Sequence, residues 1–167
     1  MIDSKRSLEL REDIEALYFG YRAFTSIPDR ILADRGLGRA HHRILYFVQR
    51  EPGVSMGDLL TVLKVTKQAI HRPVKELESL GLITVTPDAH DKRMRRVAAT
   101  EAGKQLEAQL TGEQMGLLES VFRTLDPEAE RHWRTALLRL AQAGEGQFDL
   151  LASRERGSSS RERGSNP

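Results

Sequence analysis

The chain has 167 residues, of which 39% are hydrophobic, 30% are charged and none is cysteine. The lack of cysteine excludes disulfides, thiolate zinc sites and thiol redox sensing, and no apolar run approaches the 18 residues of a membrane span. The formal net charge of +2 excludes a general polycation. Because residues 1–6 lead into charged sequence without a signal-peptide core, we expect a soluble protein in the cytoplasm.

Positive charge is concentrated in one stretch. Residues 64–96 contain eight Lys or Arg against four Asp or Glu, so this stretch is net +4 and the remainder net −2. Such a concentration is typical of a nucleic-acid surface. The tail, residues 153–167, repeats Arg-Glu-Arg-Gly-Ser and is expected to be a disordered, solvated terminus. A contribution of this tail to non-specific DNA affinity is the alternative.

The N-terminal third predicts two helices. Apolar residues at steps of three and four predict an amphipathic helix over 7–27. Pro28 predicts a break or kink, because proline has no backbone donor, and a shorter helical piece follows through Leu32. A second helix is expected over 39–50 and ends at a Glu-Pro-Gly turn. The stripe of the first helix comprises Leu10, Ile14, Leu17, Tyr21 and Phe24.

Two short capped helices follow. Ser55 is the predicted N-cap of the first, with Asp58 at its positive end. After a tight turn at Lys64-Val65, Thr66 is the predicted N-cap of the second helix, and Gly81 is its C-terminal stop. The inner face of that second helix is Ile70, Val74 and Leu77.

A hairpin and two long helices complete the pattern. β-Branched residues predict a strand over 82–86, a turn over 87–91 and a second strand over 92–99. Thr100 is the predicted cap of a helix that runs to about 125, and Asp126-Pro127 starts a last helix. The expected fold is mainly α with a small two- or three-stranded β-wing, a winged helix-turn-helix with helical dimerisation elements.

The helix after Thr66 has the side chains that base recognition needs. A helix fits the major groove, where base edges carry a unique pattern of donors and acceptors. Gln68 could recognise adenine and Arg72 guanine, each pair discriminating by about 1–3 kcal/mol. Lys67 and Lys75 suit phosphates. The alternative for this face, which also carries His71, is an ordinary solvated surface.

Pro73 lies inside this predicted recognition helix. It removes the hydrogen bond to the carbonyl of Ala69, which costs about 3 kcal/mol or more in a helix interior. We favour a kinked helix that begins at Thr66, because Ile70 keeps the apolar period. A helix that begins only at Pro73 is the competing interpretation.

Four motifs resemble the MarR family of bacterial regulators over about residues 8–145. They are the small capping residue in Leu63-Lys64-Val65-Thr66-Lys67-Gln68, the helix exit Leu77-Glu78-Ser79-Leu80-Gly81-Leu82-Ile83, the wing motif Asp91-Lys92-Arg93, and the helix entry Thr100-Glu101-Ala102-Gly103. The resemblance implies that Arg93 enters the minor groove, with Asp91 holding it or a neighbour in place. For Asp91 the alternative is a plain turn residue.

The resemblance also implies a DNA-binding residue set and a domain organisation. The pair Arg95-Arg96 departs from the family strand, which is often apolar, and makes the wing more cationic. The expected domains are residues 1–37 and 101–152 for dimerisation and 38–100 for DNA binding. The expected DNA-binding residues are Ser55, Thr66, Lys67, Gln68, His71, Arg72, Lys75, Asp91, Lys92, Arg93 and Arg95.

The expected function is a homodimeric transcriptional regulator, a repressor, on a pseudo-palindromic site. By resemblance a small-molecule effector would bind near Tyr18, Tyr21, His42 and Tyr46, although ordinary packing also explains these residues. His41 and His42 diverge on a helix, so no metal site is expected, and no cofactor or catalytic constellation is recognisable. A winged helix that binds protein without a DNA target is the alternative function.

Overall fold

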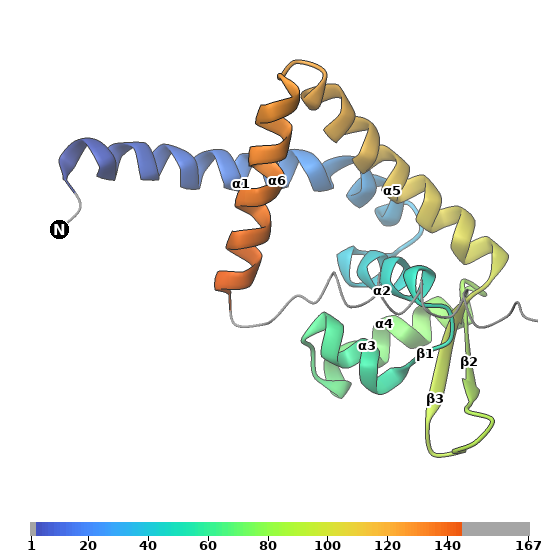
Figure 1. Cartoon of the computed structure of the whole chain (residues 1–167). Coiled ribbons are helices and arrows are strands. Elements are labelled where there is room, and N and C mark those ends of the chain that lie inside the picture. Colours follow the sequence, from blue (N-terminus) through green and yellow to red (C-terminus); the bar gives the residue numbers. More distant parts are fainter. Residues whose placement is uncertain (1–2, 145–167) are drawn as a thin grey trace, which may run out of the picture. The chain divides into compact units, whose positions relative to one another are not determined.

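The computed structural model describes residues 3–144. These residues form two compact units, one ending at Val121 and the other beginning at Phe122. The mainly helical fold with a small sheet confirms the predicted fold class (Figure 1). The elements are α1 (Ser4–Ala33), α2 (Arg39–Arg50), β1 (Val54–Ser55), α3 (Met56–Leu63), α4 (Lys67–Ser79), β2 (Ile83–Pro87), β3 (Arg95–Ala99), α5 (Glu101–Phe122) and α6 (Pro127–Ala143).

The sheet has three antiparallel strands in the order β1-β3-β2. Val97 of β3 is opposite Val54 of β1 and Val85 of β2. The strand predicted over 92–99 begins only at Arg95. The reason is local, because the side chain and carbonyl of Asp91 accept hydrogen bonds from the amides of Arg93 and Met94 and keep them in the turn. We call the β2–β3 hairpin, residues 83–99, the wing.

Side-chain caps start the helices where the sequence predicts them. In each case the side-chain oxygen accepts a hydrogen bond of 2.9 to 3.2 Å from the amide three residues later, which satisfies a donor that the helix leaves free. The predicted caps at Ser55, Thr66, Thr100 and Asp126 are confirmed. At the other end of α4, Gly81 has φ of 66°, as a glycine stop requires.

The break predicted at Pro28 is wrong, because α1 is one helix of 30 residues that continues through it; the alternative, a kink at Pro28, stays a prediction. Pro28 cannot donate to the carbonyl of Phe24, four residues earlier. Gln114 of α5 donates its side-chain N–H to that carbonyl instead, at 3.4 Å. A partner from a distant helix therefore relieves part of the cost of the proline.

The second proline, Pro73, lies inside α4, which runs without interruption from Lys67. The interpretation in which the helix begins only at Pro73 is therefore wrong. The predicted kink stays a prediction. Ile70 and Val74, on either side of Pro73, are both buried and keep the helix on the core.

The core of the first unit lies among α2, α3, α4 and the inner face of the sheet. The C-terminal part of α1 and the first turns of α5 close it. Its buried hydrophobic residues are Leu32, Leu37, Ile44, Leu45, Val48, Val54, Leu59, Ile70, Val74, Leu77, Ile83, Val97, Leu106 and Leu110.

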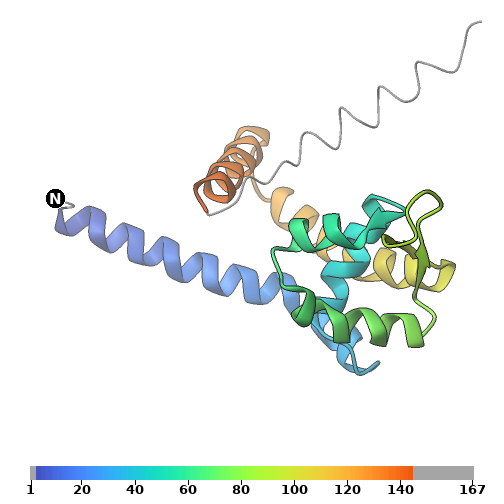
Figure 2. The same cartoon turned by 90° about the horizontal axis from the view of Figure 1, so that it is seen from below.

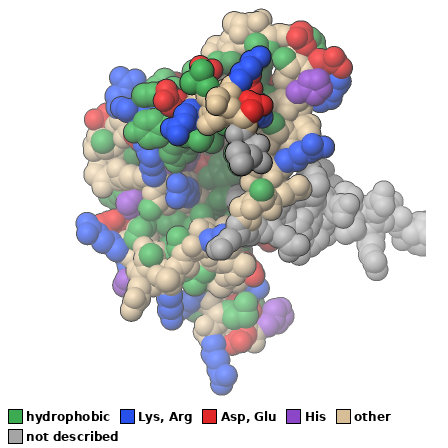
Figure 3. Space-filling model, turned by 90° about the vertical axis from the view of Figure 1, so that its left-hand side faces the viewer, with side chains coloured by type: hydrophobic (Ala, Val, Ile, Leu, Met, Phe, Trp, Pro, Cys, Tyr) green, Lys and Arg blue, Asp and Glu red, His purple; other side chains and the backbone are tan. Residues whose placement is uncertain are grey.

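The N-terminal two-thirds of α1 has an apolar stripe that the first unit does not cover. Hydrophobic side chains are visible between charged ones where the molecule is viewed from the N-terminal side of α1 (Figure 3). The exposed large hydrophobic residues of α1 are Leu8, Ile14, Leu17, Tyr18, Phe19 and Tyr21. The second unit likewise exposes Trp133, Leu138 and Leu140 of α6.

Candidate nucleic-acid interface

One face of the first unit presents α3, α4 and the wing together. These elements lie at the bottom of Figure 1 and nearest the viewer in Figure 2, which looks from below. A recognition helix and a wing on the same face can contact one duplex, with the helix in the major groove and the hairpin beside it.

The two faces of α4 are sharply divided. Its apolar side is buried in the core, while its polar side is open to solvent and begins at the N-terminal turn. The buried residues are Ile70, Val74 and Leu77. The exposed residues are Thr66, Lys67, Gln68, His71, Arg72 and Lys75, which are all the predicted contacts on this helix.

Arg72 is tied into a network that reaches α2. Its Nε donates to Oε1 of Glu76 at 2.8 Å, and Oε2 of Glu76 lies 2.8 Å from Nε2 of His41. These two hydrogen bonds, the one from Arg72 first, lower the pKa of Glu76. The same carboxylate raises the pKa of Arg72. Glu76 is therefore a charged acceptor that joins an exposed arginine to a buried histidine.

The wing turn is organised by Asp88. Its Oδ1 accepts the backbone N–H groups of His90 and Asp91 at 2.8 and 3.0 Å. Its Oδ2 accepts from Nε of Arg96 at 2.6 Å, and Arg96 also donates to the carbonyl of Gly53 at 3.2 Å. The amide of Asp91, Arg96 and the amide of His90, in that order of effect, lower the pKa of Asp88 to about 2.

The predicted contacts of the wing are exposed at its tip and on β3. Oδ1 of Asp91 accepts the backbone N–H of Arg93 at 2.9 Å, so Asp91 orders the turn through the backbone of Arg93. This is the geometry of an Asx turn, and whether Asp91 also holds the Arg93 side chain for DNA stays a prediction. Lys92, Arg93 and Arg95 are exposed.

Ser55 differs from the other predicted contacts because it is only 4% exposed. Its hydroxyl donates to Oδ2 of Asp58 at 2.6 Å and accepts the Asp58 amide at 3.0 Å. The hydroxyl therefore acts as both donor and acceptor at the start of α3. The structure places Ser55 inside the helix-turn-helix rather than on its exposed face.

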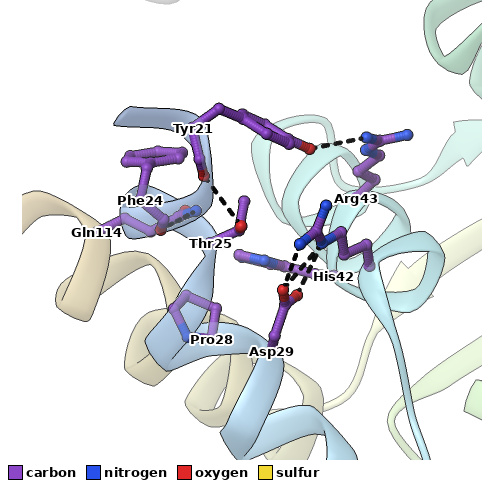
Figure 4. Close-up of a pocket in the computed structure, with 9 residues that line it drawn as sticks. Tyr21, Phe24, Thr25, Pro28, Asp29, His42, Arg43 and Gln114 are labelled. Carbon is purple, nitrogen blue, oxygen red and sulfur yellow. Dashed lines mark hydrogen bonds and ion pairs between the residues drawn. The ribbon is translucent and has the colours of Figure 1, made fainter. Parts of the chain in front are cut away.

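A small cavity of about 180 Å³ lies between α1, α2 and α5 of the first unit (Figure 4). Phe24 and Pro28 give it apolar walls, and Arg39 and Asp29, which also line it, form an ion pair of 2.6 Å. Its lining residues are Tyr21, Phe24, Thr25, Pro28, Asp29, Arg39, His42, Arg43 and Gln114.

Two of the four residues predicted for an effector pocket line this cavity. The hydroxyl of Tyr21 accepts from Arg43 at 3.4 Å. Burial lowers the pKa of His42, and its buried Nε2 has no hydrogen-bond partner among residues 3–144. Tyr18 and Tyr46 do not line the cavity; their rings lie beside Arg22 and Arg50.

Four residues that support the candidate interface lie outside the predicted set of contacts: Asp88, Arg96, Glu76 and His41. A signal for Asp88 and Arg96 exists only once the strands are in register, because Arg96 is opposite Thr86, two residues before Asp88. Arg72 and Glu76 have the i, i+4 spacing of a helical ion pair. His41 is 35 residues from Glu76, and no local pattern joins them.

Within residues 3–144, no helix is long and apolar enough to cross a membrane. The same residues bring no three His, Asp or Glu together as a group that could hold a metal ion.

The chain is similar to known transcriptional regulators. A model described as the MarR family matches residues 35–94. The HTH-type transcriptional regulator PetP of Rhodobacter capsulatus is 41% identical over 129 residues, which cover 77% of this chain and 78% of PetP. The crystal structure of a MarR family transcription regulator matches with a TM-score of 0.72 and 19% identity, covering 83% of this chain and 92% of that one. The MepR–DNA complex of S. aureus matches with a TM-score of 0.65 and 17% identity, covering 77% and 96%.

Proposed function

Because this chain belongs to the MarR family of transcriptional regulators, we propose that it binds double-stranded DNA as a homodimer, through α4 in the major groove and the wing in the minor groove. The observation that carries this proposal is the division of α4. Its inner face is buried, and Lys67, Gln68 and Arg72 stand exposed on its outer side. Residues suited to bases and residues suited to phosphates thus share one surface.

The wing supports the same proposal. Its turn is held in one shape by Asp88 and Asp91, while the side chains of Lys92 and Arg93 stay exposed. A narrow minor groove has an enhanced negative potential that attracts arginine. An ordered turn loses little entropy when its arginine enters the groove.

The proposal of a homodimer rests on apolar surface outside the winged helix. Ile14 and Leu17 of α1 are 67% and 53% exposed, and such a stripe on a helix is normally buried against a partner. A two-fold axis would place two α4 helices on half-sites about one helical turn apart, which requires a pseudo-palindrome. Occupation of such a site in the cytoplasm would repress transcription by excluding other proteins from it.

We also propose that a small-molecule effector binds in the cavity between α1, α2 and α5 and releases the DNA. Within the described part of the chain, the buried Nε2 of His42 has no hydrogen-bond partner, and a buried polar group without a partner is costly. A ligand atom that bonds to it would favour the conformation in which the cavity is filled. Release follows only if that conformation binds DNA less well.

The experiment is binding of the purified full chain to a library of genomic fragments, followed by titration of the selected duplex at increasing salt. We expect one site with two-fold sequence symmetry. Log K should fall linearly with log salt concentration, with a slope of about −0.9 for each phosphate that the protein neutralises. Binding that stays flat with salt, or that selects no fragment, would contradict the proposal and favour a winged helix that binds protein.

A further inference from the structure

A chain of hydrogen bonds fixes one edge of the Arg72 guanidinium. It starts at the backbone N–H of Gly38, which donates to Nδ1 of His41 at 2.9 Å. Nε2 of His41 lies 2.8 Å from Glu76, and the other carboxylate oxygen of Glu76 accepts from Nε of Arg72 at 2.8 Å. Every link of this chain lies within the first unit.

This series of hydrogen bonds also determines which nitrogen of His41 carries the proton. Because Nδ1 of His41 accepts a hydrogen bond, a neutral imidazole carries its proton on Nε2 and donates it to Glu76. Both oxygens of Glu76 are then used, one by His41 and one by Arg72. The side chain of His41 is 10% exposed and that of Arg72 is 86% exposed, so a buried anchor holds an exposed side chain through a carboxylate.

The position of the bond on Arg72 decides which atoms remain for DNA. Guanidinium presents two bidentate edges, one made of Nε and an Nη and one made of the two Nη atoms. Nε is used by Glu76. Neither Nη atom of Arg72 donates a hydrogen bond to any other residue within 3–144. The outer edge alone is therefore free to donate to O6 and N7 of one guanine.

We propose that Glu76 and His41 are positioning residues that commit Arg72 to base recognition through its two Nη atoms. This inference rests on the proposed DNA-binding function. An arginine already held in one orientation loses less rotamer entropy on binding than a free one. Glu76 thus contributes to discrimination at one base pair without itself contacting DNA.

The first test needs no DNA. The Nε–H resonance of Arg72 is followed by ¹⁵N NMR in the full chain, in the wild type and in Glu76→Ala, Glu78→Ala and His41→Asn variants. Glu78→Ala is the matched control. It removes the same charge from α4, and among residues 3–144 the Glu78 side chain bonds Lys75 alone. The Glu78 side chain is 34% exposed, against 35% for Glu76. His41→Asn keeps an acceptor for Gly38 and removes the Nε2–H donor.

We expect slow exchange of the Arg72 Nε proton with water in the wild type and in Glu78→Ala, and fast exchange in Glu76→Ala. His41→Asn should give an intermediate rate, because Glu76 remains but loses its anchor. Equal exchange in all four proteins would overturn the inference whether or not the chain binds DNA.

The second test uses the selected duplex and its single-base variants. The base pair contacted by Arg72 is the one at which Arg72→Ala loses its preference. At that base pair, Glu76→Ala should lose about two- to ten-fold of its discrimination, while Glu78→Ala keeps it. The double variant Glu76→Ala/Arg72→Ala should discriminate no less than Arg72→Ala. Equal losses in Glu76→Ala and Glu78→Ala, or a uniform loss at every base pair, would overturn the inference and leave the DNA-binding function intact.

Discussion

Nε of Arg96 donates to Oδ2 of Asp88 at 2.6 Å, and the same guanidinium donates to the carbonyl of Gly53. One side chain of β3 therefore joins the wing turn to the turn before β1. Arg96, which departs from the apolar pattern expected for this strand, therefore stabilises the wing through its bonds to Asp88 and Gly53. Its neighbour Arg95 is exposed.

Removal of the Asp88 side chain should loosen the wing while the helices stay folded. In Asp88→Ala, the amides of His90 and Asp91 lose their acceptor, and we expect their hydrogen exchange to become about five-fold faster. Asp91→Ala is the control. It should accelerate exchange of the Arg93 amide, whose acceptor is the Asp91 side chain, and leave the amides at positions 90 and 91 unchanged. Unchanged exchange of His90 in Asp88→Ala would contradict this role of Asp88.

The wing should also respond to acid at an unusually low pH. The pKa of Asp88 is lowered from its ordinary value of 3.8 to about 2 by the Asp91 amide, Arg96 and the His90 amide. A carboxyl whose folded-state pKa is lowered stabilises the fold fully above its ordinary value, and that contribution is lost as the pH falls toward about 2. A ¹³C NMR titration should place the Asp88 midpoint near 2. A midpoint near 4 would contradict the network.

Gly103 of α5 should not tolerate a side chain. A Cβ at this position would lie 1.9 Å from the carbonyl oxygen of Leu82, which already accepts from the amide of Thr100. Gly103→Ala must therefore move backbone, and we expect it to lower the free energy of unfolding by at least about 2 kcal/mol. Urea denaturation at fixed protein concentration measures this.

The matched control for Gly103→Ala is Gly112→Ala on the same helix. A Cβ at Gly112 meets nothing within 4 Å. Replacing an unhindered helical glycine by alanine should raise stability by about 0.5–1 kcal/mol. Two variants with equal stability would show that the contact of Gly103 with Leu82 does not limit this position.

Pro73 should lower the stability of α4. Pro73→Ala restores the donor to the Ala69 carbonyl, worth about 3 kcal/mol in a helix interior, and adds about 1 kcal/mol of entropy to the unfolded chain. We expect a net gain of about 2 kcal/mol by urea denaturation. Pro28→Ala is the comparison. It should give no such gain, because Gln114 already donates to the Phe24 carbonyl and Pro28 is buried. Equal gains would refute this explanation of the two prolines.

Local features of the fold could be predicted from the sequence. The caps at Ser55, Thr66, Thr100 and Asp126 depend on residues three apart, and the inner face of α4 depends on helical periodicity. The predicted break at Pro28 does not occur, and the donor that relieves the proline is Gln114, 90 residues from the Phe24 carbonyl that it satisfies. A local rule gives the cost of a proline but not the distant donor that offsets it.

In the candidate site, too, some residues could be predicted from local sequence and others depend on tertiary contacts. The exposed residues of α4 could be predicted, because the helical period of its apolar residues identifies the buried face and the opposite face is exposed. Asp88–Arg96 and His41–Glu76 depend on strand register and on the packing of α2 against α4. Both pairs hold other residues in place. Neither the pairing of Asp88 with Arg96 nor that of His41 with Glu76 has a local signature in a single sequence.

We propose that α4 and the wing bind one duplex together, α4 through base edges in the major groove and the wing through Arg93 in the minor groove. Binding of Gln68→Ala and Arg93→Ala to the selected duplex and its single-base variants, across a range of salt, tests it most directly. We predict that Gln68→Ala loses preference at one base pair with an unchanged salt dependence. Arg93→Ala should bind more weakly and lower the slope of log K against log salt by about one. If both variants bind every duplex as the wild type does, at every salt concentration, the claim is wrong.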